Sequence, residues 1–227
     1  MRVIWSGVGI TSASGKLGGQ VASHNKGGSY FRTKVKPLNG QTTAQNLVRS
    51  NFTGLAQGWK GLTAAQQLAW NAFGAAQLIP NKLGHKHSIS GENAYIRFNQ
   101  VILNAGGTII SVPPAATTVV PLASLSATAV HAGAVTLTFT AAPVPAGTQY
   151  QVFATPGLSA GKQFVKNRFR SVSYLAAAAA SPAVITTAYD AKFGAPIAGQ
   201  TIWFKVRAIS SATGYVSNFV QASCVVS

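Results

Sequence analysis

Two stretches in the second half of the chain decide the fold: Ala134-Val-Thr-Leu-Thr-Phe-Thr140 and Thr201-Ile-Trp-Phe-Lys-Val-Arg-Ala208. Successive side chains of a β-strand point to opposite faces, so an apolar residue at every second position gives a strand with one buried face. The first stretch places Val135, Leu137 and Phe139 on one face and threonines on the other. The second stretch repeats this alternation, with its inner face made by Ile202, Phe204, Val206 and Ala208.

Other short runs with strand character surround these two and are separated by turns such as Pro143-Val-Pro-Ala-Gly147. We expect seven strands, near 122–130, 134–140, 148–155, 163–172, 183–188, 201–210 and 215–226. Short strands at this spacing are typical of an antiparallel β-sandwich.

Helical periodicity replaces this alternation between Thr42 and about Asn104. A first helix begins after Thr42 or Thr43, carries an apolar stripe and ends at Gly58 or Gly61; the stripe consists of Val48, Phe52, Leu55 and Trp59. Thr63 and Gln66 have the spacing of a capping box, which predicts the start of a second helix. Ser90 can cap a third helix that ends near Asn104, with a buried stripe of Ala94, Tyr95, Phe98, Val101 and Ile102.

The first 41 residues are rich in glycine and basic, which argues against a helix and against a self-contained core. We expect an arm here whose clearest order lies along Tyr30–Pro37, either as a strand or as an extended segment with one cationic side. The full prediction is an α+β chain in two domains: a basic Gly-rich arm at 1–41, a helical module at 42–112, a Pro-rich linker at 113–121 and an antiparallel β-sandwich at 122–227, for which a family resemblance is given below.

The charge balance is extreme. Eighteen Lys and Arg residues face only two acids, Glu92 and Asp190, so the 227-residue chain carries a formal charge of +16. The excess is +10 in residues 1–112 and +6 in residues 113–227. A charge of this size repels itself, so we expect a polyanion or an acidic protein surface to compensate it.

This balance also excludes most enzyme classes. Glycoside hydrolysis by paired carboxylates, two-metal phosphoryl transfer and oxygen-liganded Ca²⁺ or Mg²⁺ sites all need several acids at one place. The single cysteine, Cys224, excludes an internal disulfide framework and a Cys-rich zinc module. We therefore expect a non-enzymatic protein without cofactor or small-molecule substrate. The sequence contains no stretch of the roughly 18 to 20 apolar residues that a membrane span needs, and we expect a soluble protein without a cleaved signal.

Two basic ladders are the candidate contacts for an anionic partner or nucleic acid. The first has alternating cations at Arg32, Lys34 and Lys36, with Lys16 and Lys26 nearby. The second has alternating cations at Lys166, Arg168 and Arg170. Cations of this kind bind phosphates with release of counterions, and the alternative is a solvated strand face. Solvated faces usually contain acids as well, which favours the partner interpretation.

Weaker candidates have simpler structural interpretations. His85 and His87 could bind a metal, but a surface loop explains them as well. Asp190 with His131 or His24 lacks the Gly-x-Ser-x-Gly sequence of a catalytic serine, and Gly15-Lys-Leu-Gly-Gly19 lacks the spacing of a phosphate-binding loop. Trp59 and Trp70 are expected in the helical core rather than as base-stacking platforms, and Cys224 as a small buried side chain.

The strands at 134–140 and 201–208, with Tyr150-Gln-Val-Phe-Ala154 between them and Gly214-Tyr-Val-Ser217 after them, resemble the fibronectin type III or immunoglobulin-like sandwich. The chain departs from that family at Phe139, where a tryptophan would be usual. The N-terminal part resembles uncharacterised proteins of bacteriophages and prophages. The residues that carry this second resemblance are Gly15-Lys-Leu-Gly-Gly-Gln-Val21, Lys26-Gly27, Arg32, Thr42-Thr-Ala-Gln45, Arg49, Phe52, Trp59, Leu62-Thr63, Gln66, Ala69-Trp70 and Gly91-Glu-Asn-Ala-Tyr-Ile-Arg-Phe-Asn99.

The phage resemblance implies a structural component of a virion and no particular chemistry. Our leading hypothesis is a capsid-associated or decoration, connector or tail subunit, made in the host cytoplasm. Its basic arm would bind acidic virion proteins or packaged DNA within a homo-oligomeric assembly. The first alternative is a DNA-packaging or DNA-protecting protein with its ladders on phosphates, and the second is an adhesin that holds acidic glycans on its β-domain.

Overall fold

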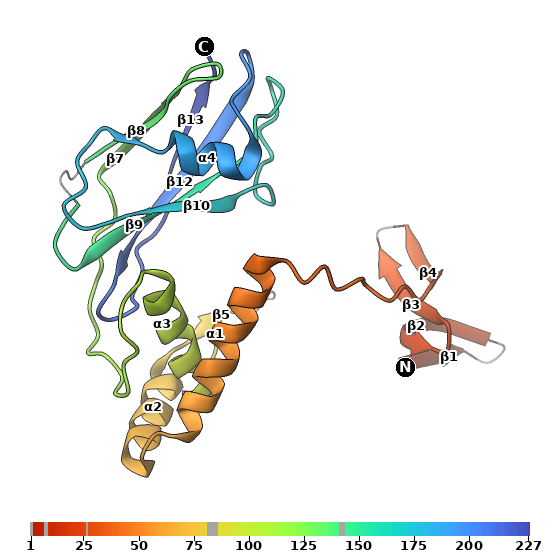
Figure 1. Ribbon diagram of the computed structural model, residues 1–227. Coiled ribbons are helices and arrows are strands. Elements are labelled where there is room, and N and C mark those ends of the chain that lie inside the picture. Colours follow the sequence, from red (N-terminus) through yellow and green to blue (C-terminus); the bar gives the residue numbers. More distant parts are fainter. Residues whose placement is uncertain (1, 7–8, 26, 81–85, 141–143) are drawn as a thin grey trace. The chain divides into compact units, whose positions relative to one another are not determined.

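A computed structural model describes residues 2–6, 9–25, 27–80, 86–140 and 144–227, with only the backbone described before Ala13. The chain divides into two compact units, Met1–Asn46 and Leu47–Ser227. Helices and antiparallel sheets both occur, so the predicted α+β class is confirmed (Figure 1).

The first unit contains an antiparallel sheet of four strands in the order β1-β2-β3-β4. The strands are β1 (Arg2–Ser6), β2 (Gly9–Leu17), β3 (Gln20–Asn25) and β4 (Gly28–Thr33). The sheet differs from the arm without a core of its own that we expected, because the glycines serve as turn residues, although β4 overlaps the strand considered at Tyr30–Pro37. Gly18 between β2 and β3 has a φ of 54°, a conformation that glycine adopts without steric cost. Ala13 and Ala22 are buried in this sheet.

Three helices begin the second part of the fold: α1 (Thr43–Lys60), α2 (Ala64–Ala76) and α3 (Gly91–Asn104). Thr63 forms the predicted capping box with Gln66, and the Ser90 hydroxyl accepts from the Asn93 N–H. A short pair of strands, β5 (Ile79–Pro80) and β6 (Lys86–His87), lies between α2 and α3. The helices share a core of Leu55, Trp70, Ala94, Tyr95 and Phe98.

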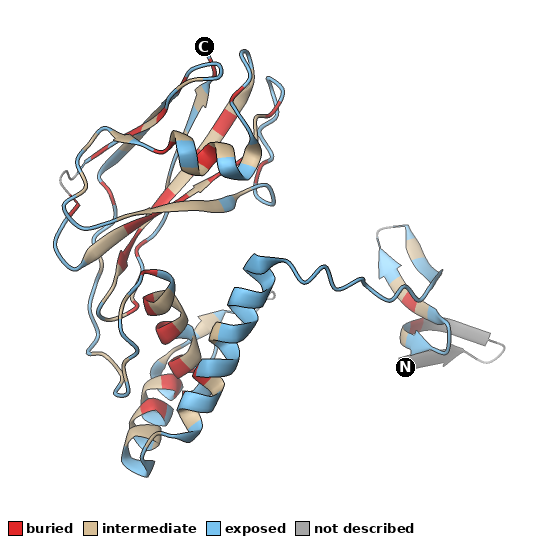
Figure 2. Ribbon diagram, in the orientation of Figure 1, coloured by how far each residue is buried: buried red, intermediate tan, exposed pale blue. Residues whose placement is uncertain are grey.

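Only two of the four residues in the apolar stripe of α1 are removed from solvent as expected. Leu55 is buried and Trp59 half-buried, whereas Val48 and Phe52 are exposed. Figure 2 shows α1 mostly exposed and α3 with several buried positions. The helix also continues through Gly58, which we expected to end it. A Cβ at Gly58 would lie 3.0 Å from the Tyr95 hydroxyl, so the missing side chain leaves space for that ring.

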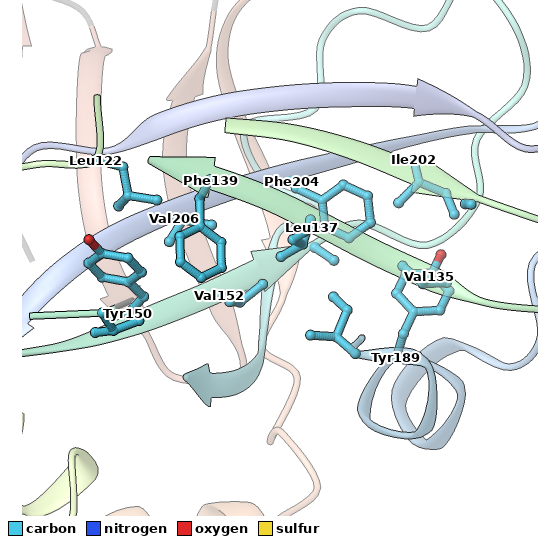
Figure 3. Close-up of a cluster of buried hydrophobic side chains, with 14 of the residues drawn as sticks. Leu122, Val135, Leu137, Phe139, Tyr150, Val152, Tyr189, Ile202, Phe204 and Val206 are labelled. Atoms are coloured by element: carbon cyan, nitrogen blue, oxygen red, sulfur yellow. The ribbon is translucent and has the colours of Figure 1, made fainter. Parts of the chain in front are cut away.

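Two antiparallel sheets follow, and they share one hydrophobic core. The larger has the order β10-β9-β12-β13 and the smaller the order β11-β8-β7. Their strands are β7 (Ser124–Ala129), β8 (Val135–Thr140), β9 (Thr148–Ala154), β10 (Arg170–Leu175), β11 (Ala183–Val184), β12 (Thr201–Ser210) and β13 (Val220–Val225). Side chains from β8, β9 and β12 meet in this core, among them Leu137, Val152 and Phe204 (Figure 3).

Three strand predictions differ from the structure. The strand expected at 215–226 begins only at Val220, after an isolated bridge at Val216. The strand expected at 163–172 begins only at Arg170, because residues 166–168 form a turn. The strand expected at 183–188 ends at Val184, and α4 (Thr186–Phe193) follows at once. Tyr189 on α4 is buried in the core that the two sheets share. Because the residues of α4 show little amphipathic pattern, this tertiary contact stabilises the helix.

The helices and the two sheets lie within the second unit and contact one another. The rings of Phe98 and Tyr215 meet edge to face at 5.0 Å, and the Gln149 amide donates to the Ala105 carbonyl at 2.7 Å. The segment expected as a linker, 113–121, also lies within this unit. The limits proposed for the helical module, linker and β-domain remain predictions.

Candidate anion-binding surfaces

The first predicted ladder is only partly carried by the N-terminal sheet. Lys16 on β2 pairs with Val21 on β3, and Val21 pairs with Arg32 on β4, so Lys16 and Arg32 share one face and both are exposed. Lys34 and Lys36 follow the end of β4, and both are exposed. The strand therefore does not align them with Arg32 as predicted. Lys26 lies outside the described residues.

The second predicted ladder is not a strand face. Lys166 and Arg168 lie in the turn that precedes β10, where the Arg168 N–H donates to the Val165 carbonyl at 2.9 Å. The Arg170 guanidinium donates to the carbonyls of Asn167 and Phe169, at 3.1 and 3.0 Å. Arg170 therefore helps to close the turn, while Lys166 and Arg168 remain exposed to solvent.

A cation–aromatic cluster that we did not predict lies on the outer face of the larger sheet. The Lys205 ammonium lies 5.1, 4.5 and 4.6 Å from the ring centres of Phe153, Phe169 and Phe219. The Arg207 guanidinium lies 5.9 Å from Phe153 and 5.2 Å from Phe219. Strand pairing explains the arrangement, because Lys205 is opposite Phe153 and Phe219 directly precedes β13. Cations attract the faces of aromatic rings electrostatically, so these rings hold both cations in place.

Hydrogen bonds fix the guanidinium of Arg207 further. Its Nε donates to Gln151 Oε1 at 2.9 Å, and Gln151 Nε2 contacts the Tyr174 hydroxyl at 2.7 Å. Burial lowers the pKa of Lys205, and the positive charge of Arg207 lowers it further. Burial raises the pKa of Tyr174, although the hydrogen bond from Ser171 and the charge of Arg207 act in the opposite direction. Two partly desolvated cations thus lie side by side, and an anion at this face would relieve their repulsion.

A groove of about 380 Å³ adjoins Lys205. Three phenylalanine side chains and two lysine side chains line it, together with smaller contributions from neighbours: Gln163, Phe164, Val165, Lys166, Phe169, Lys205, Phe219 and Gln221. Phe164 is 76% exposed and Phe219 is 44% exposed. We call this hollow the phenylalanine groove. It combines ring faces open to solvent with cations and contains no acidic side chain.

A second hollow of about 230 Å³ lies beside Arg207, the next residue after Lys205 on the outer face of β12. Its polar lining includes Arg97 of α3 and Arg207 of β12, and its apolar lining includes Phe98 and Tyr215. Because Arg207 and Lys205 alternate with inward residues of the same strand, the two hollows lie along one cationic face. The helices therefore extend a binding surface that begins on the sheet.

The two acids do little to neutralise these charges. Glu92 is exposed in the first turn of α3, and Asp190 is half-buried on α4. Of the Lys and Arg side chains that the structure describes, only Lys205 and Arg207 are not exposed. The excess charge therefore faces solvent in both units.

The weaker candidates mostly have structural roles. Trp70 is fully buried and Trp59 packs on Tyr95, so the expected core positions are confirmed. His24 bonds Ser29, and His131 contacts the backbone of Pro196 and Ala198. Cys224 is half-buried against the shared core, which raises the pKa of its thiol.

The histidine pair His85 and His87 is only partly described. His87 is exposed on β6, and His85 lies outside the described residues. Within the described part of the chain, no group of three or more His, Cys, Asp or Glu side chains could hold a metal ion. None of the helices formed by described residues is long and apolar enough to cross a membrane.

The cation–aromatic cluster had a signal in the sequence that was not used. Phe153 and Trp203 are large apolar residues at outward positions of strands whose inward positions are already apolar. Such residues indicate either a covered face or a binding face. The partners Phe169 and Phe219 carried no comparable signal, because each precedes a strand in irregular chain.

Comparison of the sequence with family models and with curated proteins finds no match. The interpretation of function therefore rests on the geometry and charge of the chain itself.

Proposed function

We propose that this chain is a non-enzymatic structural subunit of a bacteriophage virion that binds acidic surfaces of neighbouring subunits. Capsid-associated or decoration, connector and tail positions all fit this role. The observation that carries the proposal is the surplus of solvent-exposed cations in both units, against one exposed and one half-buried acid. An anionic neighbour would compensate a charge that the molecule itself leaves uncompensated.

Exposed apolar side chains support an assembly role. Val48 and Phe52 on α1 are both more than half exposed, as are Val35 and Leu38 in the segment between β4 and α1. Apolar residues on a surface favour contacts with other proteins. Such contacts would add buried apolar area to the electrostatic attraction.

We further propose that residues 122–227 form an Ig/fibronectin III-like β-sandwich. The first, second and fifth strands along the chain (β7, β8 and β11) pair in one sheet, and the third, fourth, sixth and seventh (β9, β10, β12 and β13) pair in the other. This distribution of strands over two sheets and one core is similar to the connectivity of immunoglobulin-like domains, which supports the proposal. Domains of this kind serve widely as interaction modules, which agrees with a subunit role.

The proposal is tested by quantitative mass spectrometry of purified phage particles from a lysate that expresses the chain. We expect a fixed copy number per particle, and release of the chain when the ionic strength is raised well above 0.15 M, because salt screens exposed charges. Presence in the lysate but absence from the particles would refute a structural role.

Nucleic-acid binding is the second candidate function. The phenylalanine groove favours it, because exposed aromatic rings beside cations suit bases and phosphates together.

A further inference from the structure

We propose that the outer face of the larger sheet in the second unit binds single-stranded nucleic acid. The exposed rings of Phe164 and Phe219 would stack on bases, and Lys166, Lys205 and Arg207 would face the phosphates. This inference shares with the proposed function only the requirement for an anionic partner.

The cations of this face form a track rather than a single point. Lys205 and Arg207 are two residues apart on β12, which places them about 7 Å from each other along the strand. Lys166 extends the track at the phenylalanine groove, and Arg97 extends it at the second hollow. A linear polyanion can contact such a row with successive charges, whereas a small anion would use only one position.

The aromatic rings lie within the track. Phe219 contacts both cations, at 4.6 Å from the Lys205 ammonium and 5.2 Å from the Arg207 guanidinium. Phe164, which also lines the groove, contributes a ring that is 76% exposed. Every base has a flat face that can stack on such a ring, independent of sequence. Rings and cations side by side on one face can therefore contact bases and phosphates together.

Other anionic ligands use this surface less completely. A DNA duplex presents phosphates but keeps its bases stacked inside, so it leaves the exposed rings without partners. An acidic sugar needs acceptors for its hydroxyl groups, yet the phenylalanine groove has no carboxylate and only two amide side chains, Gln163 and Gln221. The same two amides can bond the edges of unpaired bases. Single strands therefore fit best.

The affinity for single strands is measured by fluorescence anisotropy with a labelled oligothymidine of about 12 nucleotides, within the range of known single-strand sites. The full chain is titrated at several salt concentrations. Competitors are the unlabelled oligonucleotide, a duplex of the same length and a sulfated polysaccharide at equal charge. We expect the single strand to compete best.

Two pairs of variants test the site. Phe164→Leu should weaken binding about tenfold because it removes a stacking face, whereas Phe164→Tyr should retain it. The change Lys166→Gln should lower the slope of log affinity against log salt by about 0.7, the value for one phosphate contact. Lys192→Gln is the matched control, since this exposed α4 lysine lines neither hollow. Phe164 and Lys166 are exposed, so their replacement leaves the fold intact.

Equal binding by Phe164→Leu and the parent chain would overturn the inference, as would equal competition by duplex or polysaccharide. Absence of any nucleic-acid binding would also overturn it, while a fixed copy number in particles would still support the structural role. Conversely, a chain absent from particles that binds single strands through Phe164 would refute the structural role and support this site.

Discussion

Asn99 is expected to be the polar side chain that fixes the segment after α3 to that helix. It is fully buried, and its amide makes three hydrogen bonds. The Nδ2 group donates to the carbonyls of Tyr95 and Ile110, both at 3.1 Å, and Oδ1 accepts from the Ile110 N–H at 2.7 Å. One side chain thus ties residues 108–112, which have no regular secondary structure, to a helix.

Replacement of Asn99 by alanine leaves the N–H and the carbonyl of Ile110 without these partners. Each unsatisfied group costs about 1 to 3 kcal/mol, and the half-buried position of Ile110 admits some water, so the lower part of that range applies. We expect Asn99→Ala to reduce the free energy of unfolding by about 3 kcal/mol. For a unit of this size the corresponding fall in melting temperature is about 6 to 12 °C.

Urea unfolding followed by circular dichroism measures this loss. Asn99→Asp should be worse than alanine at pH 7, because a carboxylate cannot donate to the two carbonyls and loses hydration on burial. Burial raises the pKa of the introduced carboxyl in the folded state, so its destabilisation should decrease as the pH falls toward about 4. Asn104→Asp is the control on the same helix, where the residue is exposed and the cost should stay below about 1 kcal/mol. A loss under 1 kcal/mol for Asn99→Ala would refute this reasoning.

Two further changes test the packing of the second unit. Burial, with smaller contributions from Cys224 and Asp190, raises the pKa of Tyr189 to about 12. The neutral Tyr189 side chain therefore stabilises the fold fully below about pH 10, and this stabilisation decreases by roughly 3 kcal/mol as the pH rises to about 12. Tyr189→Phe loses the hydrogen bond to Thr155 but should escape this alkaline loss; a stability difference between the two proteins that stays constant from about pH 8 to pH 11 would contradict the assignment. Gly91→Ala should cost at least about 2 kcal/mol in urea unfolding, because its Cβ would lie 2.8 Å from the Trp70 carbonyl carbon. Gly54→Ala, which meets nothing within 4 Å, should instead stabilise α1 by about 0.5 to 1 kcal/mol; similar effects of the two changes would show that close backbone packing at Gly91 is not the cause.

Local signals in the sequence were sufficient for several elements. The capping residues Thr63 and Ser90 act on backbone groups within three positions, so the starts of α2 and α3 were predictable. The alternation at 134–140 and 201–208 likewise predicted β8 and β12, because a strand exposes every second side chain to the same environment. The acid-poor composition, from which an anionic partner was inferred, is also a property of the sequence alone.

Elements that depend on distant partners were not predictable in this way. The helix α4 gains its order from burial of Tyr189 in a core made by other segments. The glycine-rich N-terminal segment gains its order from pairing between consecutive strands, which no single strand shows by itself. The basic alternation at 164–170 contains a turn at residues 166–168, which the hydrogen bond from the Arg168 N–H to the Val165 carbonyl closes. The spacing of charged residues in the sequence does not distinguish such a turn from a strand.

The sequence by itself determined the capped helices, the alternating strands and the surplus of positive charge. The tertiary structure alone decided which cations meet aromatic rings. Phe153, Phe169 and Phe219 come from separate parts of the chain: strand register places Phe153 opposite Lys205, and the segments that enter β10 and β13 bring Phe169 and Phe219 to it. Register depends on pairing between residues far apart in sequence, so the cation–aromatic face exists only in the folded protein.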